Sequence, residues 1–319
     1  MLSSRIPYSW REISDILRSI RNHNECPVKY IYFGIGAERF EKVLRHPKYE
    51  SARVETELLR KKAINIVHRM KKPDNLNVID LGCGDGSKAL TLLKRFTELN
   101  QAVKYYAVDI SGDMLNSAAN TIERNLPKVE IEVENRDFEE GPLSEFCDQI
   151  RTRKYPINLL LFLGHSLGNV SNIDKMVVNI AASMNADDFC LIGVELFHTM
   201  RVQAIEAEYD FDEMFQLVFT PLEYLGVPRR VGHFSRPRFN YTRKEVEVAF
   251  AVHKPWVKEF RSNMCLELRP RQRIIMARSH KFTKKDLARL LAMHDLSILD
   301  SFADRESKFL LLFCQRGSR

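Results

Sequence analysis

Three closely spaced glycines and a downstream aspartate have the types and spacing of a nucleotide-binding site. The segment Asp80-Leu81-Gly82-Cys83-Gly84-Asp85-Gly86 lies between a short apolar run, 77–81, and an amphipathic stretch that begins at Ser87. Glycines let the backbone turn sharply and approach a ligand, and the free amides at the start of the next helix favour an anionic group. Asp109 ends the following apolar run, where a carboxylate accepts hydrogen bonds from both hydroxyls of a ribose.

A second acid and an aromatic residue extend this pattern. Asp137 and Phe138 follow a third apolar run, so that the acid can bind an adenine amino group while the ring packs on the base. A dinucleotide fold requires G-x-G-x-x-G, but the third glycine here, Gly86, comes one residue early. The D-L-G-C-G-x-G form instead resembles the first motif of class I S-adenosylmethionine (SAM) methyltransferases. We therefore expect SAM as the cofactor; the alternative is a glycine turn without a ligand.

The segment after the fourth apolar run narrows the family. Leu161-Phe162-Leu163-Gly164-His165-Ser166-Leu167-Gly168-Asn169 resembles the F-L-G-S-x-x-G-N motif of the histidine-specific SAM-dependent methyltransferases. These are the ergothioneine-pathway histidine Nα-methyltransferases and a related dimethylallyltryptophan N-methyltransferase. Similar family motifs occur in the same order along the chain, at 32–40 (YFGIGAERF), 47–49 (PKY), 53–55 (RVE), 279–282 (SHKF) and 303–309 (ADRESKF).

The resemblance implies a role for each matching position of the cofactor site. Gly82 and Gly84 match the SAM-binding glycines, and Asp109 matches the ribose-binding acid. Lys88 matches a lysine that binds the SAM carboxylate. The adenine-binding pair of the family matches Asp137 and Phe138.

The resemblance also implies a substrate site. Tyr32 matches a tyrosine beside the substrate amine, and Tyr49 and Asn169 match residues that hold the carboxylate and amine of an amino acid. Tyr32 and Asn169 are the candidate catalytic residues. Tyr209 falls at the position of another carboxylate-binding tyrosine, and Ser279 matches a serine near the substrate side chain.

Several positions depart from the family pattern. The histidine enzymes carry E-x-S in the last substrate strand, whereas this chain has Ala277-Arg278-Ser279. Loss of one hydrogen-bonding anchor in a buried site costs about 1–3 kcal/mol. Arg278 becomes a candidate substrate-binding residue, Gly34 replaces an acid, and His165 replaces a small hydroxyl residue. We therefore expect the amine of a small amino acid or of an amino-acid derivative as substrate, with histidine as one candidate.

The elements that position these residues alternate from residue 77 onward. Apolar runs at 77–81, 103–110, 129–133, 157–163 and 189–196 alternate with amphipathic stretches of helical period. This order predicts an α/β fold with a doubly wound parallel sheet, the Rossmann-like fold of class I methyltransferases, closed by an antiparallel hairpin near 297–314. A smaller α+β substrate domain accompanies it. We expect the SAM-binding domain over 58–198 plus 279–319 and the substrate-binding domain over 1–57 plus 199–278.

Composition argues against several other classes of protein. The chain has 319 residues, 45% hydrophobic and 29% charged, with a formal net charge of +7. Its apolar runs are strand-sized rather than the ~20 residues that span a membrane, and the N-terminus lacks an apolar stretch of signal-peptide length. The six cysteines form no CxxC pair, which argues against zinc or any metal and favours the reducing cytoplasm.

Three functions remain open. The first is N-methylation of a small amine by a monomer. The second is methylation of nucleic acid or protein, although no RNA-recognition motif accompanies the arginines near 229–238 and 269–273. The third is a SAM-binding protein without catalysis, suggested by the missing pocket acid.

Overall fold

The chain forms two compact units. The computed structural model describes residues 6–70, 75–261 and 264–317. One unit comprises residues 50–198 and 281–319, and the other comprises 1–49 and 199–280. The expected boundary at 57/58 therefore lies at 49/50, because a helix that starts at Glu50 packs along its length in the unit of the parallel sheet. The later boundary lies at 280/281 instead of 278/279, since β11 runs on to His280.

A seven-stranded sheet forms the core of the first unit, which we call the sheet unit. Its strand order is β12-β13-β5-β4-β1-β2-β3. Neighbouring strands among β1 to β5 are parallel, whereas β13 is antiparallel to β5 and to β12. The predicted doubly wound sheet with a closing hairpin is confirmed. The strands are β1 (Asn75–Leu81), β2 (Ala102–Asp109), β3 (Glu130–Asn135), β4 (Ile157–Phe162), β5 (Phe189–Glu195), β12 (Leu296–Ala303) and β13 (Phe309–Arg316).

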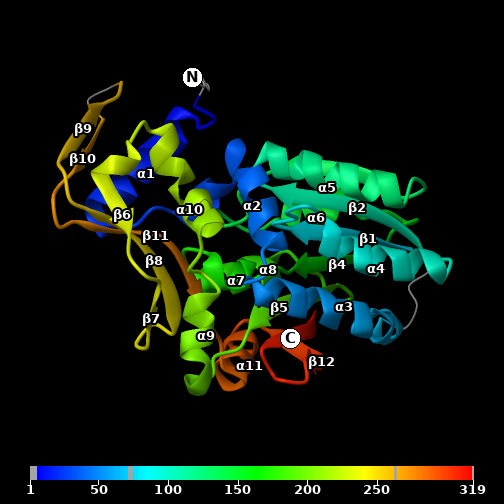
Figure 1. Ribbon diagram of the computed structural model, residues 1–319. Helices are drawn as coiled ribbons and strands as arrows, with labels where there is room; N and C mark the ends of the chain where they lie inside the picture. The colour runs from blue at the N-terminus through cyan, green and yellow to red at the C-terminus, as the bar shows by residue number, and fades with distance from the viewer. Residues whose placement is uncertain (1–5, 71–74, 262–263, 318–319) are drawn as a thin grey trace. The chain divides into compact units, whose positions relative to one another are not determined.

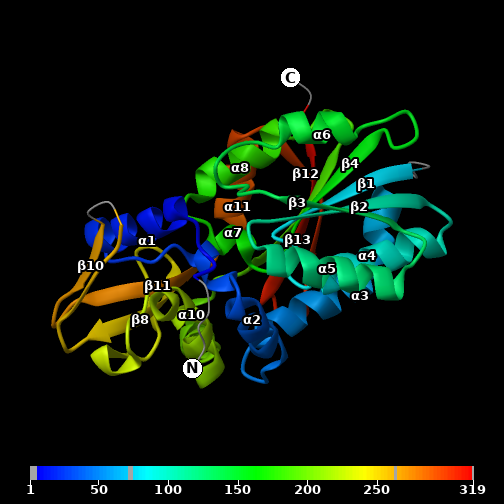
Figure 2. The ribbon, with the colours of Figure 1, turned by 90° about the horizontal axis from the view of Figure 1, so that it is seen from above.

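Helices cover both faces of this sheet. Figure 2 shows α3, α4 and α5 on one face and α6, α8 and α11 on the other. Each face has its own apolar cluster, and β1 is buried along almost its whole length, as expected for a central parallel strand. The helices are α3 (Glu50–Arg69), α4 (Ser87–Glu98), α5 (Gly112–Asn125), α6 (Ser144–Ile150), α7 (Ser166–Asn169), α8 (Ile173–Ala182) and α11 (Lys284–Met293).

Side-chain caps fix several of these helix starts. Asn172 accepts the Lys175 amide at the start of α8, at 2.9 Å. Thr283 accepts the Asp286 amide at the start of α11, at 3.1 Å. Such caps satisfy amides that have no partner within the helix.

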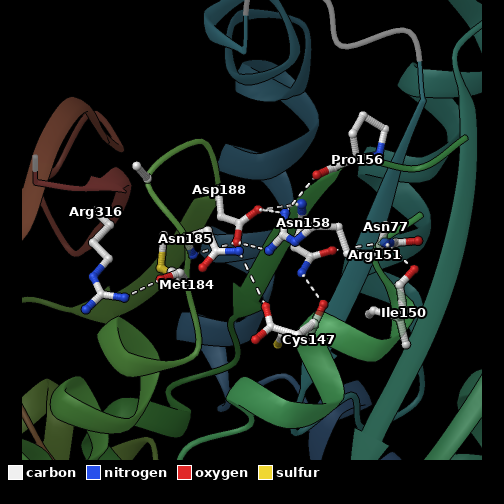
Figure 3. Close-up of polar contacts among 12 residues, drawn as sticks. Asn77, Cys147, Ile150, Arg151, Pro156, Asn158, Met184, Asn185, Asp188 and Arg316 are labelled. Carbon is white, nitrogen blue, oxygen red and sulfur yellow. Dashed lines mark hydrogen bonds and ion pairs between the residues drawn. The ribbon is translucent and has the colours of Figure 1, made fainter. Parts of the chain in front are cut away.

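The amino ends of the strands carry a network of polar side chains joined by hydrogen bonds (Figure 3). The buried Asp188 carboxylate accepts both Arg151 Nη atoms, at 2.9 and 2.7 Å, and the Asn158 amide at 2.8 Å. The Asn77 side chain donates to Asn158 Oδ1 at 2.9 Å, and Asn158 donates to the Cys147 carbonyl at 3.0 Å. This network joins β1, β4, α6 and the start of β5 through protein groups alone.

The second unit, which we call the tyrosine unit, mixes helices with small antiparallel sheets. Its sheet has the order β11-β8-β6, β7 also pairs with β8, and β9 pairs with β10. The stretch from 232 to 259 therefore forms several short strands, interrupted by turns. The elements are α1 (Trp10–His23), η1 (Val28–Tyr32), α2 (Ile35–Arg45), η2 (Thr199–Arg201), α9 (Val202–Ala207), α10 (Asp212–Tyr224), η3 (Arg229–Val231), β6 (Gly232–Phe234), β7 (Arg238–Asn240), β8 (Glu245–Val252), β9 (Trp256–Glu259), β10 (Cys265–Leu268) and β11 (Arg273–His280). Figure 1 labels most of these elements. In the described part of the chain, no helix has the length and apolar character to cross a bilayer.

Candidate cofactor and substrate sites

The glycine loop joins the carboxyl end of β1 to the start of α4. Gly82, Gly84 and Gly86 have φ angles of +69°, +54° and +74°, a left-handed conformation that favours glycine. The Gly82 amide donates to the Val108 carbonyl of β2 at 2.8 Å. A Cβ at Gly86 would lie 3.0 Å from the Ala118 Cα of α5. The loop therefore requires glycine both for its turns and for the close approach of two helices.

Asp109 ties this loop to the end of β2. Its side chain is buried and accepts the Ser111 amide at 2.9 Å, together with the Gly84 and Ile110 amides. Burial raises the pKa of this carboxyl to about 6, although the three amides oppose the shift. Above that pH the ionised group is a strong acceptor at the carboxyl edge of the sheet.

A second buried acid lies beneath the loop. Asp80, the last but one residue of β1, accepts the Tyr105 hydroxyl at 2.9 Å. Burial raises its pKa to about 7, while the Tyr105 hydroxyl and the Lys88 charge act in the opposite direction. This acid is held by the protein itself, so we assign it to supporting the loop. It was not among the predicted site residues.

Segments that follow β3 and β4 meet at Gly82. A Cβ placed there would lie 3.5 Å from Phe138 Cζ and 3.4 Å from Ser166 Oγ. The Phe138 ring packs edge-on against Phe162, with ring centroids 5.6 Å apart. Asp137 Oδ1 accepts the Glu139 amide at 3.0 Å, which fixes the turn that carries both residues of the predicted adenine-binding pair. The structure thus brings Gly82 and Phe138 together at the carboxyl edge of the sheet.

Asn169 ends the short helix α7 of the same unit. Its Oδ1 atom is buried and lacks a hydrogen-bond partner among the residues that the structure describes. A buried acceptor without a partner costs about 1–3 kcal/mol. A donor on a ligand would remove this cost, which agrees with a role for Asn169 in binding an amine.

Two of the predicted tyrosines meet in the tyrosine unit. The rings of Tyr49 and Tyr209 pack edge-on, with centroids 6.2 Å apart, and both are buried. The neighbouring His46 ring stacks on Phe211 at 4.0 Å, and Lys48 Nζ donates to the Asp210 carbonyl at 2.8 Å. Segments 46–49 and 209–211 are therefore held against one another, with Tyr49 and Tyr209 in contact.

Tyr32 has a different neighbour. It ends η1 and packs edge-on against Phe40 of α2, with centroids 5.0 Å apart. Nearby, Gly34 adopts φ +55°, and a Cβ there would lie 2.3 Å from the Tyr224 hydroxyl oxygen, which accepts the Ile35 amide at 2.9 Å. The glycine that replaces the family acid therefore leaves room for a tyrosine from α10.

Ser279 and Arg278 occupy opposite faces of β11. Ala277 and Ser279 are buried, whereas Arg278 is half-buried and pairs with the Glu25 carboxylate at 3.2 Å. Because side chains alternate along a strand, Arg278 does not take the place of the missing acid beside Ser279. The predicted substrate-binding role of Arg278 stays a prediction, and in the structure its guanidinium joins β11 to Glu25.

His165 belongs to a buried charged cluster. Its Nδ1 lies 3.6 Å from Glu195 Oε2, and Lys281 Nζ lies 2.6 Å from the same oxygen. Burial, together with the charges of Lys281 and Lys88, lowers the pKa of His165 well below its usual value. The imidazole is therefore neutral near pH 7 and supports the turn before α7.

The residues at the carboxyl edge fit SAM. The glycine loop leads into a helix start, a buried acid terminates β2, and an aromatic ring lies against Gly82. In such sheets ligands bind outside the carboxyl ends of the strands. Gly82 and Gly84 would contact the amino-acid end, Asp109 the ribose, and Asp137 and Phe138 the adenine.

Known proteins with similar sequences agree with this assignment. The chain is 27% identical over 172 residues to a histidine N-alpha-methyltransferase of Mycobacterium tuberculosis, which is 53% of this chain and 50% of that protein. It is 21% identical over 290 residues to ergothioneine biosynthesis protein 1 of Schizosaccharomyces pombe, with 87% of this chain and 37% of that protein covered. The chain thus spans half or less of the length of these relatives.

A structural relative and a family model complete the comparison. The magnesium protoporphyrin IX methyltransferase of Synechocystis, solved with bound SAM, has a TM-score of 0.47 and 12% identity, and the match covers 91% of this chain and 95% of that one. A model described as histidine-specific methyltransferase, SAM-dependent, matches residues 11–316. Since this match covers nearly the whole sequence, the chain belongs to the family of histidine-specific, SAM-dependent methyltransferases.

Proposed function

We propose that this protein transfers a methyl group from SAM to the amine of a small amino acid or of an amino-acid derivative. The observation that carries the proposal is the meeting of the glycine loop, Asp109 and Phe138 at one edge of the sheet, in a chain of this family. SAM supplies a methyl group on a positively charged sulfur. The residues of the chain must therefore bind the donor and hold an uncharged amine in line with its carbon–sulfur bond.

The proposed substrate residues have distinct tasks. Tyr49 and Tyr209 would donate their hydroxyls to the substrate carboxylate, since their rings already pack together. Asn169 Oδ1 would accept a hydrogen from the amine, and Tyr32 would orient that amine. The amine lone pair forms the new bond to carbon, the carbon–sulfur bond breaks, and the proton released from nitrogen passes to water.

We propose a class of substrate, small amines, rather than one particular amino acid. The described face of β11 that carries Ser279 has Ala277 where the histidine enzymes have glutamate, and Arg278 points away from it. This supports a partner other than an imidazole ring, although the relatives include proteins named for histidine and for dimethylallyltryptophan. The cytoplasmic location and the monomeric state remain predictions.

Calorimetry followed by a turnover panel tests the proposal. We expect SAM and S-adenosylhomocysteine to bind the wild-type chain, and one member of a panel of amino acids and amines to gain methyl groups by mass spectrometry. Binding without a methylated small product would favour the alternatives, namely a macromolecular substrate or a SAM-binding protein without catalysis. Absence of SAM binding would contradict all three.

Matched tyrosine variants test the substrate site. Tyr49→Phe and Tyr209→Phe keep the packed rings but remove the hydroxyls, so KM for the amino acid should rise about tenfold with unchanged affinity for S-adenosylhomocysteine. Tyr241→Phe, at an exposed ring of the same unit, is the control. Unchanged KM in both variants would contradict the assigned clamp.

A further inference from the structure

Helix α3 carries a carboxylate in its apolar stripe. Glu55 is fully buried (0% exposed), and its neighbours on the same face include Ala52, Leu58 and Leu59, which are also buried. A buried charge costs several kcal/mol unless it is paired and hydrogen-bonded. Without a specific partner for the carboxylate, an apolar residue such as leucine would therefore be more stable at this position.

Glu55 has two such partners. One oxygen, Oε2, lies 3.0 Å from Lys88 Nζ, and the other, Oε1, accepts the Gly164 amide at 2.8 Å. The backbone amide thus hydrogen-bonds one oxygen, whereas the other is ion-paired with Lys88 and makes no hydrogen bond in the described residues.

Two glycines leave the space that this pair needs. A Cβ at Gly164, where φ is +77°, would lie 2.7 Å from Lys88 Nζ, and a Cβ at Gly193 of β5 would lie 2.4 Å from Glu55 Oε1. Contacts that short do not occur, so a side chain at either position would displace the pair. The turn after β4 and the strand β5 therefore leave the space that Glu55 and Lys88 occupy.

The pair connects two parts of the cofactor edge. Lys88 is the second residue of α4, directly after the glycine loop, and its side chain is 19% exposed. Gly164 begins the turn that leads into α7, and that helix ends at Asn169. Helix starts after glycine loops attract anionic groups, and the partly exposed ammonium of Lys88, which Glu55 holds there, supplies further N–H donors.

We propose that Glu55 is a positioning residue that holds Lys88 for the carboxylate of the donor. By fixing the ammonium and the Gly164 amide together, Glu55 makes the site prefer donors that keep the amino-acid carboxylate. This inference rests on the proposed function, since it assumes that SAM is the donor. Glu55 itself contacts no substrate atom; it acts through Lys88.

Titration calorimetry with two ligands separates this role from general support of the fold. S-adenosylhomocysteine carries the carboxylate, whereas its decarboxylated form keeps the amine and lacks only that group. Glu55→Gln retains an acceptor for the Gly164 amide but loses the charge. We expect it to bind S-adenosylhomocysteine about tenfold more weakly and the decarboxylated form as wild type does. Glu57→Gln, on the exposed side of α3 beside Arg60 and Lys61, is the control and should change neither affinity.

A double variant keeps the test valid if Glu55→Gln folds poorly. Lys88→Met should lose the same preference, and adding Glu55→Gln to it leaves no lone buried charge and should cause no further loss. A Glu55→Gln variant would overturn the role of Glu55, but not the proposed function, in either of two cases. The ratio of its affinities for the two ligands stays at the wild-type value, or both affinities fall by the same factor. Failure of the wild-type chain to bind either ligand would instead overturn the proposed function and, with it, this assignment.

Discussion

Aspartate and asparagine side chains lie at both ends of the parallel sheet, but their hydrogen-bond partners differ between the two ends. At the amino end, Asp188, Arg151, Asn77 and Asn158 are joined by side-chain hydrogen bonds (Figure 3), although Asn77 Oδ1 has no partner in the described residues. At the carboxyl end, Asp109 is held by backbone amides, and Asn169 Oδ1 has no partner in the described residues. Polar groups that satisfy one another stabilise the fold, whereas groups fixed by the backbone remain able to bind a ligand.

The largest effect is expected at the amino end. Asp188→Asn removes a buried charge and leaves the Arg151 guanidinium, only 20% exposed, without its partner. We expect the free energy of unfolding in urea to fall by about 3 kcal/mol, with unchanged affinity for S-adenosylhomocysteine. Glu98→Gln, which breaks an exposed pair with Arg95, should change stability by less than about 1 kcal/mol. A loss of affinity for S-adenosylhomocysteine in Asp188→Asn would contradict the view that the amino end serves stability and only the carboxyl end binds the ligand.

The next effect is expected at the carboxyl end. Asp109→Ala removes the acceptor proposed for two ribose hydroxyls, each bond to a charged group being worth about 1.5 kcal/mol or more. Affinity for S-adenosylhomocysteine should therefore fall about a hundredfold by calorimetry. Glu123→Gln, exposed on α5, is the control. An Asp109→Ala variant with wild-type affinity would mean that the ribose binds elsewhere.

The pH dependence of binding sharpens the assignment of Asp109. Burial raises the pKa of this carboxyl to about 6, and ribose hydroxyls donate more strongly to its ionised form. Affinity for S-adenosylhomocysteine should therefore be full above pH 7 and fall by up to about tenfold as the pH drops to 5. Asp109→Asn should bind weakly with little change over this range. An equally steep pH profile in that variant would assign the titration to another group.

The smallest effect is expected from the aromatic ring beside Gly82. Phe138→Leu keeps an apolar side chain but loses the face proposed to pack on adenine, which is worth about 1 kcal/mol. Affinity for S-adenosylhomocysteine should fall about fivefold, measured by calorimetry. Phe146→Leu, whose ring packs on Tyr106 instead, should leave that affinity unchanged. Equal losses in the two variants would indicate a general packing effect.

The cofactor edge could be predicted because its chemistry is local. Each glycine of the loop requires a positive φ or a close approach, and Asp109 and Asp137 follow successive strands, so the sequence pattern already implies that they meet. The substrate residues were harder to place. Tyr49 and Tyr209 are distant in the sequence, and only the resemblance to a family related them before their rings were found in contact.

Other points depend on packing that the sequence pattern leaves open. Arg278 and Ser279 are both predicted for the substrate site, and the structure places their side chains on opposite faces of β11, with Arg278 paired to Glu25. The first domain boundary was placed inside α3 because a helix gives no sign in its sequence of the unit against which it packs.

The sequence by itself determined the alternating strands and helices, the glycine loop and the acids at the strand ends, because these depend on backbone conformation and short-range periodicity. Only the tertiary structure decided that Glu55 pairs with Lys88 and that Gly164 and Gly193 leave room for that pair. It also decided that the polar side chains of the amino end hydrogen-bond to one another. Such pairings join segments far apart in the chain, and they depend on the distances between packed elements, which no local pattern encodes.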